Sequence, residues 1–295
     1  MKRPTIAVFF AFFLVSVICA VFAGCATSNK KQTPNTPSNE LKEEEKEDEK
    51  PETMRVALYF LKDTGTDLYL VREEHTIPKT TQVAKTAVEQ LINGRPVTEN
   101  AFKVLPKGTK VLGISINNGL ATVDFTREVL EANVGSSGEA LGIQSIVNTL
   151  TEFPAINKVA FKVEGKLDER AKDWWGHVGL YEQPFTRDLS NVREPAIWVT
   201  TPKPGNEVSS PLTVRGSAMV FEAVVSMRIV TKDGQKIAQA NTMAAGGAPL
   251  RGDFNTGMSF KAPASVKEGY LEVYWASPKD GSDLDLVKIP IKFKK

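Results

Sequence analysis

The stretch SIVNTLTEFPAINKVAFKVEG, residues 145–165, decides how the first half of this chain folds. Its apolar residues are first spaced as on one face of a helix and then alternate as in a strand. Pro154 stands between the two patterns and disfavours helical backbone at Phe153. The stretch therefore predicts a helix that ends before the proline and a strand that follows it. The two patterns are carried by Ile143, Ile146, Val147 and Leu150, then by Val159, Phe161 and Val163.

Length and composition indicate a globular protein of about two domains. The chain has 295 residues, of which 41% are hydrophobic and 24% are charged, and one domain ordinarily takes about 100 to 200 residues. The 37 basic and 35 acidic side chains leave a net charge of +2. No strong field of one sign surrounds such a molecule, so we expect no nucleic-acid partner.

The N-terminus has the layout of a secretory signal. A basic start, MKRP, precedes an apolar run that ends in FAGC, with small residues in front of Cys25. FAGC resembles a bacterial lipobox, which implies removal of residues 1–24 and a diacylglycerol on Cys25, although Phe22 stands where the motif usually has Leu. The alternative is a retained membrane anchor, because the apolar run is about long enough to span a bilayer. Both interpretations put the body of the protein outside the cytoplasm.

A polar tether, residues 25–53, is expected to follow the anchor. It contains hardly an apolar side chain and includes the charge run KEEEKEDEK, so it cannot bury enough surface to offset the entropy cost of ordering. Cys19 lies in the leader and Cys25 would carry the lipid. The mature body therefore has no thiol for catalysis, for a disulfide or for a metal site.

The first folded unit is predicted to be a mixed sheet with helices on one face. RVALYFL (55–61) and DLYLVREEHTI (67–77) alternate like the two strands of a hairpin. In TTQVAKTAVEQLINGRP (80–96) the apolar positions share one helical face. A second hairpin is expected to turn at Asn118 and Gly119, which suit the positive φ of a tight turn. A sheet covered by helices buries all of these apolar faces.

The ordered motifs of this unit carry a family resemblance. They are LINGRP (91–96), LPKGTKVLGISINNGLATVDFT (105–126) and the stretch 145–165. Together they resemble the GerMN domain of sporulation and germination lipoproteins from endospore-forming bacteria, over about residues 54–168. The resemblance implies a small α/β module with a ring-building type of fold that is used in spore envelope assembly and germination. It implies no catalytic residue.

Asp124 and Glu128 are the carboxylates of this unit that could be interpreted as a catalytic pair. Glycoside hydrolysis needs two carboxyl groups at a defined separation. A position at a strand edge or a helix start explains both residues without a cleft. We therefore assign no catalytic residue to the chain.

Aromatic side chains gather in residues 169–193, the connection to the next unit. They could form an exposed platform for sugar rings or for a protein partner. We favour the interpretation that they close the first domain and pack on the second, because aromatic side chains dominate internal packing as much as recognition. His177 and His75 are the two histidines of the chain and form no metal or triad pattern. The gathered side chains are Trp174, Trp175, His177, Tyr181 and Phe185.

Residues 194–295 are predicted to form an all-β sandwich. About seven short alternating segments are separated by Pro, Gly and Asp-Gly turns, which is the pattern of such folds. The segments IWVTTPKPGNEVSSPLTVRGSA (197–218), DGQKIAQ (233–239) and YLEVYWASPKDGSDLDLVKIPIKF (270–293) carry a second resemblance. They are similar to the immunoglobulin-like module that accompanies GerMN domains in spore-associated proteins.

Two loops of the second unit invite interpretation as ligand sites. DGSDLD offers Asp280, Asp283 and Asp285 as calcium ligands, but it lacks the spacing and the distal Glu of an EF-hand loop, so we expect a hairpin turn. MAAGGAPLRG (243–252) has no Lys followed by Ser or Thr and is no phosphate loop. We expect neither a metal nor a cofactor.

The sequence thus predicts an α+β protein in which a small mixed-sheet α/β domain of ring-building type precedes an immunoglobulin-like sandwich. We expect a lipid-anchored binding or assembly component of the spore or cell envelope, held through Cys25 on the extracytoplasmic face of the membrane. Candidate partners are peptidoglycan, envelope proteins and a second copy of the first domain. The alternatives are a peptidoglycan (cortex) hydrolase that acts in germination and a purely structural spacer.

Overall fold

The computed structural model describes residues 52–294, which belong to one compact unit. The predicted signal peptide, Cys25 and most of the tether lie outside these residues. Within the described range, no helix is both long and apolar enough to cross a membrane.

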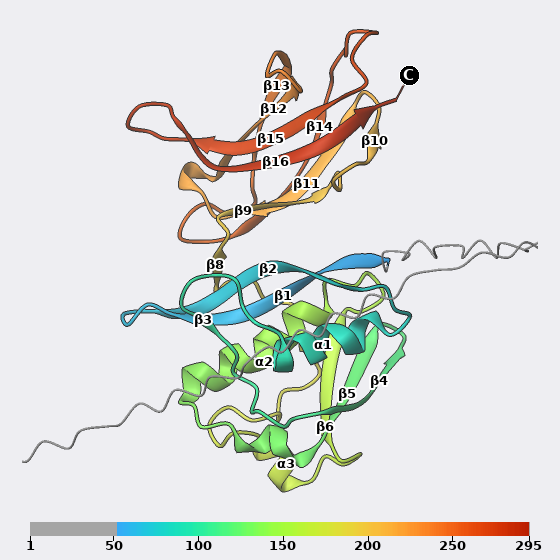
Figure 1. Cartoon of the computed structure of the whole chain (residues 1–295). Coiled ribbons are helices and arrows are strands. Elements are labelled where there is room, and N and C mark those ends of the chain that lie inside the picture. Colours follow the sequence, from blue (N-terminus) through green and yellow to red (C-terminus); the bar gives the residue numbers. More distant parts are fainter. Residues whose placement is uncertain (1–51, 295) are drawn as a thin grey trace, which may run out of the picture. The chain divides into compact units, whose positions relative to one another are not determined.

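The first domain, residues 53–194, consists of two four-stranded sheets and their accompanying helices (Figure 1). The strand orders are β3-β1-β2-β8 and β4-β5-β6-β7. The elements are β1 (Thr53–Asp63), β2 (Leu68–Pro78), α1 (Val83–Asn93), β3 (Ala101–Phe102), β4 (Val111–Asn117), β5 (Leu120–Phe125), the 3-10 helix η1 (Arg127–Glu131), α2 (Ser136–Leu150), β6 (Lys158–Val163), α3 (Glu169–Asp173), β7 (Phe185–Thr186) and β8 (Val192–Glu194).

The predicted hairpins and the helix-to-strand switch are confirmed. β1 pairs with β2 antiparallel along its whole length. β4 and β5 meet at Asn118 (φ 48°) and Gly119 (φ 80°), the two positive-φ residues that a tight hairpin turn needs. α2 ends at Leu150, before Pro154, and forms the crossover between β5 and β6, which are parallel.

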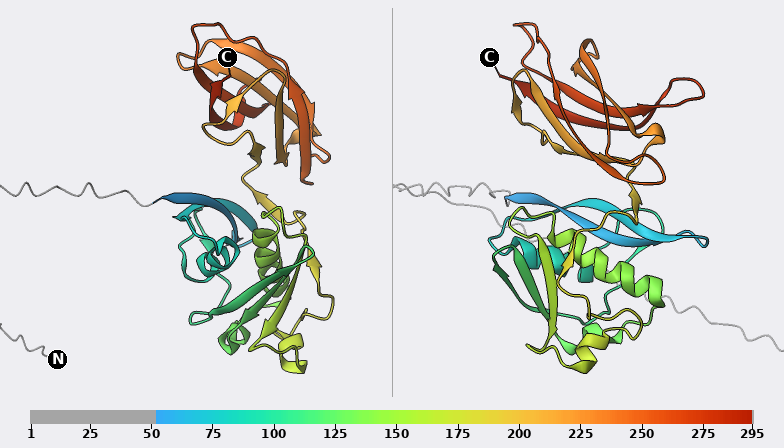
Figure 2. Two further views of the ribbon diagram at one scale, coloured as in Figure 1. Left: turned by 90° about the vertical axis from the view of Figure 1, so that its right-hand side faces the viewer. Right: turned by 180° about the vertical axis from the view of Figure 1, so that it is seen from behind.

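The core of the first domain is closed by apolar faces from both sheets and from α1 and α2. The alternating residues of β5 and β6 that face this core are entirely or almost entirely buried, as are those of the predicted helix stripe. α2 also lies along β1, as Figure 2 shows. Here the hydroxyls of Ser145 and Thr149, one helical turn apart, bond the backbone C=O and N–H of Tyr59. They satisfy backbone groups that no neighbouring strand reaches.

The second domain, residues 197–293, is a sandwich of a five-stranded and a three-stranded sheet (Figure 2). The strand orders are β10-β16-β15-β12-β13 and β14-β11-β9. The α+β class and the predicted sandwich are therefore confirmed, whereas the first domain has two sheets where one mixed sheet was expected. The elements are β9 (Ile197–Thr201), β10 (Glu207–Val208), β11 (Leu212–Ala218), the 3-10 helix η2 (Phe221–Ala223), β12 (Val224–Thr231), β13 (Lys236–Met243), β14 (Gly252–Met258), β15 (Glu268–Ala276) and β16 (Asp283–Phe293).

Candidate functional site

The paired tryptophans of the aromatic segment are internal packing residues. Trp174 has no exposed surface, and its ring lies 6.2 Å from that of Phe125 and 5.6 Å from that of Phe161. The Trp175 indole N–H donates to the carbonyl of Val129 at 2.7 Å. Both rings belong to the core of the first domain. Tyr181 is 59% exposed and lies outside this core, so the structure does not assemble the five side chains into one platform.

Glu139 holds the loop that follows these tryptophans. Its carboxylate lies in the first turn of α2, is fully buried, and accepts the backbone N–H groups of four residues in the loop 175–179 at 2.8 to 3.3 Å. Such charge-assisted bonds are about twice as strong as neutral ones. His177 is held by its backbone here, and its ring contacts the carbonyl of Val134. The loop is therefore fixed by structure-forming contacts.

The carboxylates considered as catalytic or calcium-binding groups bond to protein partners of their own. Asp124 lies one residue before the end of β5 and accepts the N–H of Gly165 at 2.9 Å, so it fixes the turn after β6 and does not cap a helix. The pKa of Glu128 is lowered, first by a hydrogen bond to Thr126.

The three aspartates of DGSDLD are likewise divided among different partners within the β15–β16 hairpin and its neighbour β12. Asp280 accepts the N–H of Ser282, Asp283 pairs with Arg228, and Asp285 accepts the indole N–H of Trp275. The predicted hairpin is confirmed.

A buried ionic network is the main polar feature of the first domain. Glu152, just beyond α2, accepts from Arg72 of β2 at 3.2 Å and from Arg187 at 2.8 Å. The Tyr59 hydroxyl donates to the same carboxylate at 2.6 Å and accepts from Arg187 at 2.9 Å. Tyr59 and Arg72 face each other because they are paired residues of β1 and β2.

The network holds the Glu152 side chain in its ionised form. Burial opposes ionisation, but the charges of Arg72 and Arg187 and the hydrogen bonds outweigh it and lower the Glu152 pKa to about 2. Burial and the neighbouring Glu152 charge raise the pKa of the Tyr59 hydroxyl well above its ordinary value. A carboxylate with this pKa is an acceptor at neutral pH and cannot serve as a general acid.

The segment between the domains is tied to both of them. Trp198 of β9 is 5% exposed and shares an apolar cluster with residues of β1, β2, α2 and β8. The guanidinium of Arg72 lies 5.2 Å from the centre of its ring, and that of Arg251 lies 4.0 Å from it, both cation–π contacts. Arg251 also donates to four backbone carbonyls within residues 192–196, at 2.6 to 3.3 Å.

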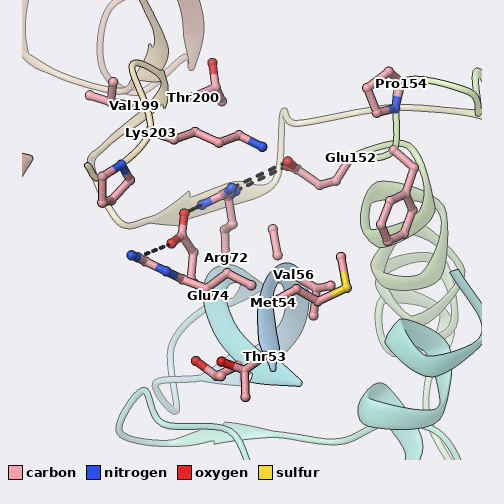
Figure 3. Close-up of a pocket in the computed structure, with 15 residues that line it drawn as sticks. Thr53, Met54, Val56, Arg72, Glu74, Glu152, Pro154, Val199, Thr200 and Lys203 are labelled. Carbon is pink, nitrogen blue, oxygen red and sulfur yellow. Dashed lines mark hydrogen bonds and ion pairs between the residues drawn. The ribbon is translucent and has the colours of Figure 1, made fainter. Parts of the chain in front are cut away.

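A cavity of about 740 Å³ lies beside this network (Figure 3). Figure 3 shows Arg72 bonded to Glu152 and to Glu74 at its wall, with Lys203 extending towards them. Its volume is in the range of small-molecule sites, about 300 to 1,000 Å³. We call it the β1–β9 cavity. It is lined by Thr53, Met54, Arg55, Val56, Ala57, Arg72, Glu74, Thr76, Glu152, Phe153, Pro154, Val199, Thr200, Lys203 and Pro204.

Sequence reasoning did not single out the residues of this site. Glu152 and Trp198 stood within segments that were interpreted as helix end and strand, and their partners lie far away in the sequence. The one local signal was the run of charged residues Arg72, Glu73 and Glu74 in the second half of a strand whose first half is mostly apolar.

Comparison with known families gives two matches, one for each domain. Residues 57–169 match the family described as "Sporulation and spore germination", and residues 196–282 match the "Immunoglobulin-like domain of bacterial spore germination". The chain is 30% identical over 258 residues to the "Spore germination protein GerM" of Bacillus subtilis, an alignment of 83% of this chain and 66% of that protein. The chain thus spans slightly less than two thirds of this relative.

Solved structures of related proteins include two from the same bacterium. The first GerMN domain of the sporulation protein GerM is 29% identical, with a TM-score of 0.39 and coverage of 45% of this chain and 98% of that one. Its tandem GerMN domains are 20% identical, with a TM-score of 0.41 and coverage of 70% and 62%.

Proposed function

We propose that this chain, which belongs to the proteins that join a sporulation and spore germination (GerMN) domain to an immunoglobulin-like domain of bacterial spore germination, is a binding and assembly component of the cell envelope. Its role would be in spore formation and germination, as the name of its GerM relative suggests. Its ligand would be peptidoglycan or a protein of the envelope.

The ionised form of the Glu152 carboxyl group is the observation that favours a binding function over hydrolysis. Of the carboxylates that line the β1–β9 cavity, Glu152 is the more deeply buried, and two arginines hold its pKa at about 2. Glycosidases instead keep one carboxyl group protonated as a general acid by raising its pKa. The environment of Glu152 therefore supports a structural acceptor at a ligand-sized cavity.

We further propose that a lipid on Cys25 holds the protein on the extracytoplasmic face of the cell membrane. The FAGC motif after an apolar run supports this assignment. Labelled palmitate should enter the wild-type protein in the producing cell and should not enter the Cys25→Ser variant. Equal labelling of both proteins, or labelling of neither, would contradict the lipid anchor.

One experiment separates binding from hydrolysis. The full chain, purified in a mild detergent, is incubated with purified cortex and vegetative peptidoglycan, followed by sedimentation and by mass spectrometry of released fragments. We expect the protein in the pellet and no release above that of heat-inactivated protein. Release of fragments would establish the rival hydrolase function. Protein that stays in the supernatant would point to a protein partner, and self-association of the first domain would then be tested by analytical ultracentrifugation.

A further inference from the structure

The β1–β9 cavity has more positive than negative charge. Three cations and two carboxylates line it, and Arg187 adds a further cation to the Glu152 side of the wall. The carboxylates are already engaged: Glu74 pairs with Arg55 and Arg72, and Glu152 pairs with Arg72 and Arg187. None of these ion pairs among the described residues at the cavity wall includes the Lys203 ammonium group. Lys203 is thus the lining cation whose charge is available to a ligand.

The backbone of Lys203 is held in place, so its side chain starts from a fixed point at the cavity. Its N–H donates to the Asn206 side chain at 2.9 Å, and its carbonyl accepts the N–H of Asn206 at 3.1 Å. The turn is attached to β16, because Gly205 donates to the carbonyl of Pro290 at 2.7 Å. The side chain itself is exposed and extends into the cavity (Figure 3).

The remaining walls offer two other kinds of contact. Threonine hydroxyls from β1, β2 and β9 can donate to or accept from a ligand, and apolar side chains beyond α2 and on β1 and β9 can cover its carbon surface. A ligand that fits these walls has a free carboxylate, several amide or hydroxyl groups, and small apolar substituents. The apolar side chains available for this are those of Ala57, Pro154 and Val199. Met54, Val56 and Phe153 also line the cavity, but their side chains pack in or against the core of the first domain.

We propose that the β1–β9 cavity binds a carboxylate-bearing glycopeptide of the bacterial wall, with the Lys203 ammonium group paired to a ligand carboxylate. The inference rests on the proposed function, because it takes peptidoglycan as the source of the ligand. Peptidoglycan fragments combine sugar hydroxyls, N-acetyl groups and a short peptide with free carboxylates. These groups match the threonine hydroxyls, the apolar side chains and the Lys203 ammonium group of the cavity. A charge-assisted bond of this type supplies specificity as well as affinity.

Calorimetric titration of the full chain with purified disaccharide-tetrapeptide fragments tests the proposal. We expect binding by the wild-type chain and a loss of at least about tenfold in affinity for Lys203→Glu, which is about 1.4 kcal/mol. Lys203→Ala should lose less. The matched control is Lys279→Glu, which makes the same charge change at an exposed lysine outside the cavity lining and should bind like wild type. Fragments with methyl-esterified carboxylates should bind weakly to every variant.

Sedimentation of the same proteins with whole peptidoglycan distinguishes the two proposals. If the wild-type chain pellets but the fragments bind wild type and Lys203→Glu equally, or do not bind, the cavity is not the site and the wall-binding function stands. If the esterified fragments bind as tightly as the free acids, the carboxylate pairing is wrong. If the wild-type chain neither pellets nor binds a fragment, the cavity proposal fails and the wall-binding form of the proposed function fails with it, which leaves an envelope protein as the partner.

Discussion

Replacement of Glu152 by Gln should destabilise the first domain, because it leaves two buried or half-buried arginines without their shared carboxylate. Arg72 and Glu152 have 7% and 16% of their side-chain surface exposed. The shift of the Glu152 pKa from 4.5 to about 2 corresponds to about 3 kcal/mol, at about 1.4 kcal/mol per unit. Removal of one partner from a buried ion pair generally costs about 3 to 5 kcal/mol. We therefore expect the free energy of unfolding to fall by about 3 kcal/mol at pH 7.

The lowered pKa of Glu152 also determines how the stability of the fold depends on pH. The pKa of Glu152 is lower in the folded state than in the unfolded state, so its ionisation stabilises the fold fully above about pH 4.5. This contribution is lost as the pH falls from about 4.5 towards about 2, because the unfolded chain takes up the proton first. The stability difference between the wild-type chain and Glu152→Gln should therefore be largest at neutral pH and should shrink over this window.

Urea unfolding, followed by tryptophan fluorescence and circular dichroism from pH 7 to pH 3, measures both effects. Trp174 and Trp175 report on the first domain, because both rings lie in its core. Glu182→Gln is the matched control, since Glu182 is exposed and lies outside the Arg72–Glu152–Arg187 network; it should change the stability by less than about 0.5 kcal/mol. A loss below about 1 kcal/mol for Glu152→Gln, or a loss that does not depend on pH, would refute the account of the network.

Three further variants, one of them a double substitution, test the contacts that order the fold. Trp198→Ala should cost about 3 to 5 kcal/mol and should speed proteolysis within residues 192–196; cleavage at the wild-type rate would show that this indole does not protect the segment. Glu139→Gln should cost about 2 kcal/mol, since an amide presents one acceptor oxygen to N–H groups that now share two, and amide hydrogen exchange should rise in the loop that it holds. Unchanged exchange there would contradict this role. Ser145→Ala combined with Thr149→Val should cost about 2 to 4 kcal/mol in urea unfolding, because two buried backbone groups of β1 lose their partners; a loss no larger than that of either single variant would show that the two hydroxyls do not act separately.

The spacing of apolar residues, turn residues and prolines predicted those parts of the fold that depend on neighbouring positions in the chain. The turn at Asn118 and Gly119 follows from backbone sterics, and the end of α2 before Pro154 follows from the same kind of constraint. The alternation at Val159 and Phe161 places both side chains on the same face of their strand, and this face is the one that the structure buries. The role of the aromatic side chains in residues 169–193 was harder to predict, because such a composition fits an exposed ligand platform as well as a buried core. Burial of Trp174 and Trp175 decided for the core.

The sequence by itself determined the α+β class, the order of the two domains and the main hairpins and helices of the first one, because periodicity, turn residues and proline act over a few positions. Only the tertiary structure decided which charged residues share a site. Glu152 bonds to Arg72 and Arg187, which are 80 and 35 positions away in the sequence. Trp198 of β9 contacts Arg251, which lies in the connection between β13 and β14. Such pairings depend on how distant elements pack and on how much solvent they exclude. Neither the packing of distant elements nor the exclusion of solvent can be predicted from the spacing of residues along the chain.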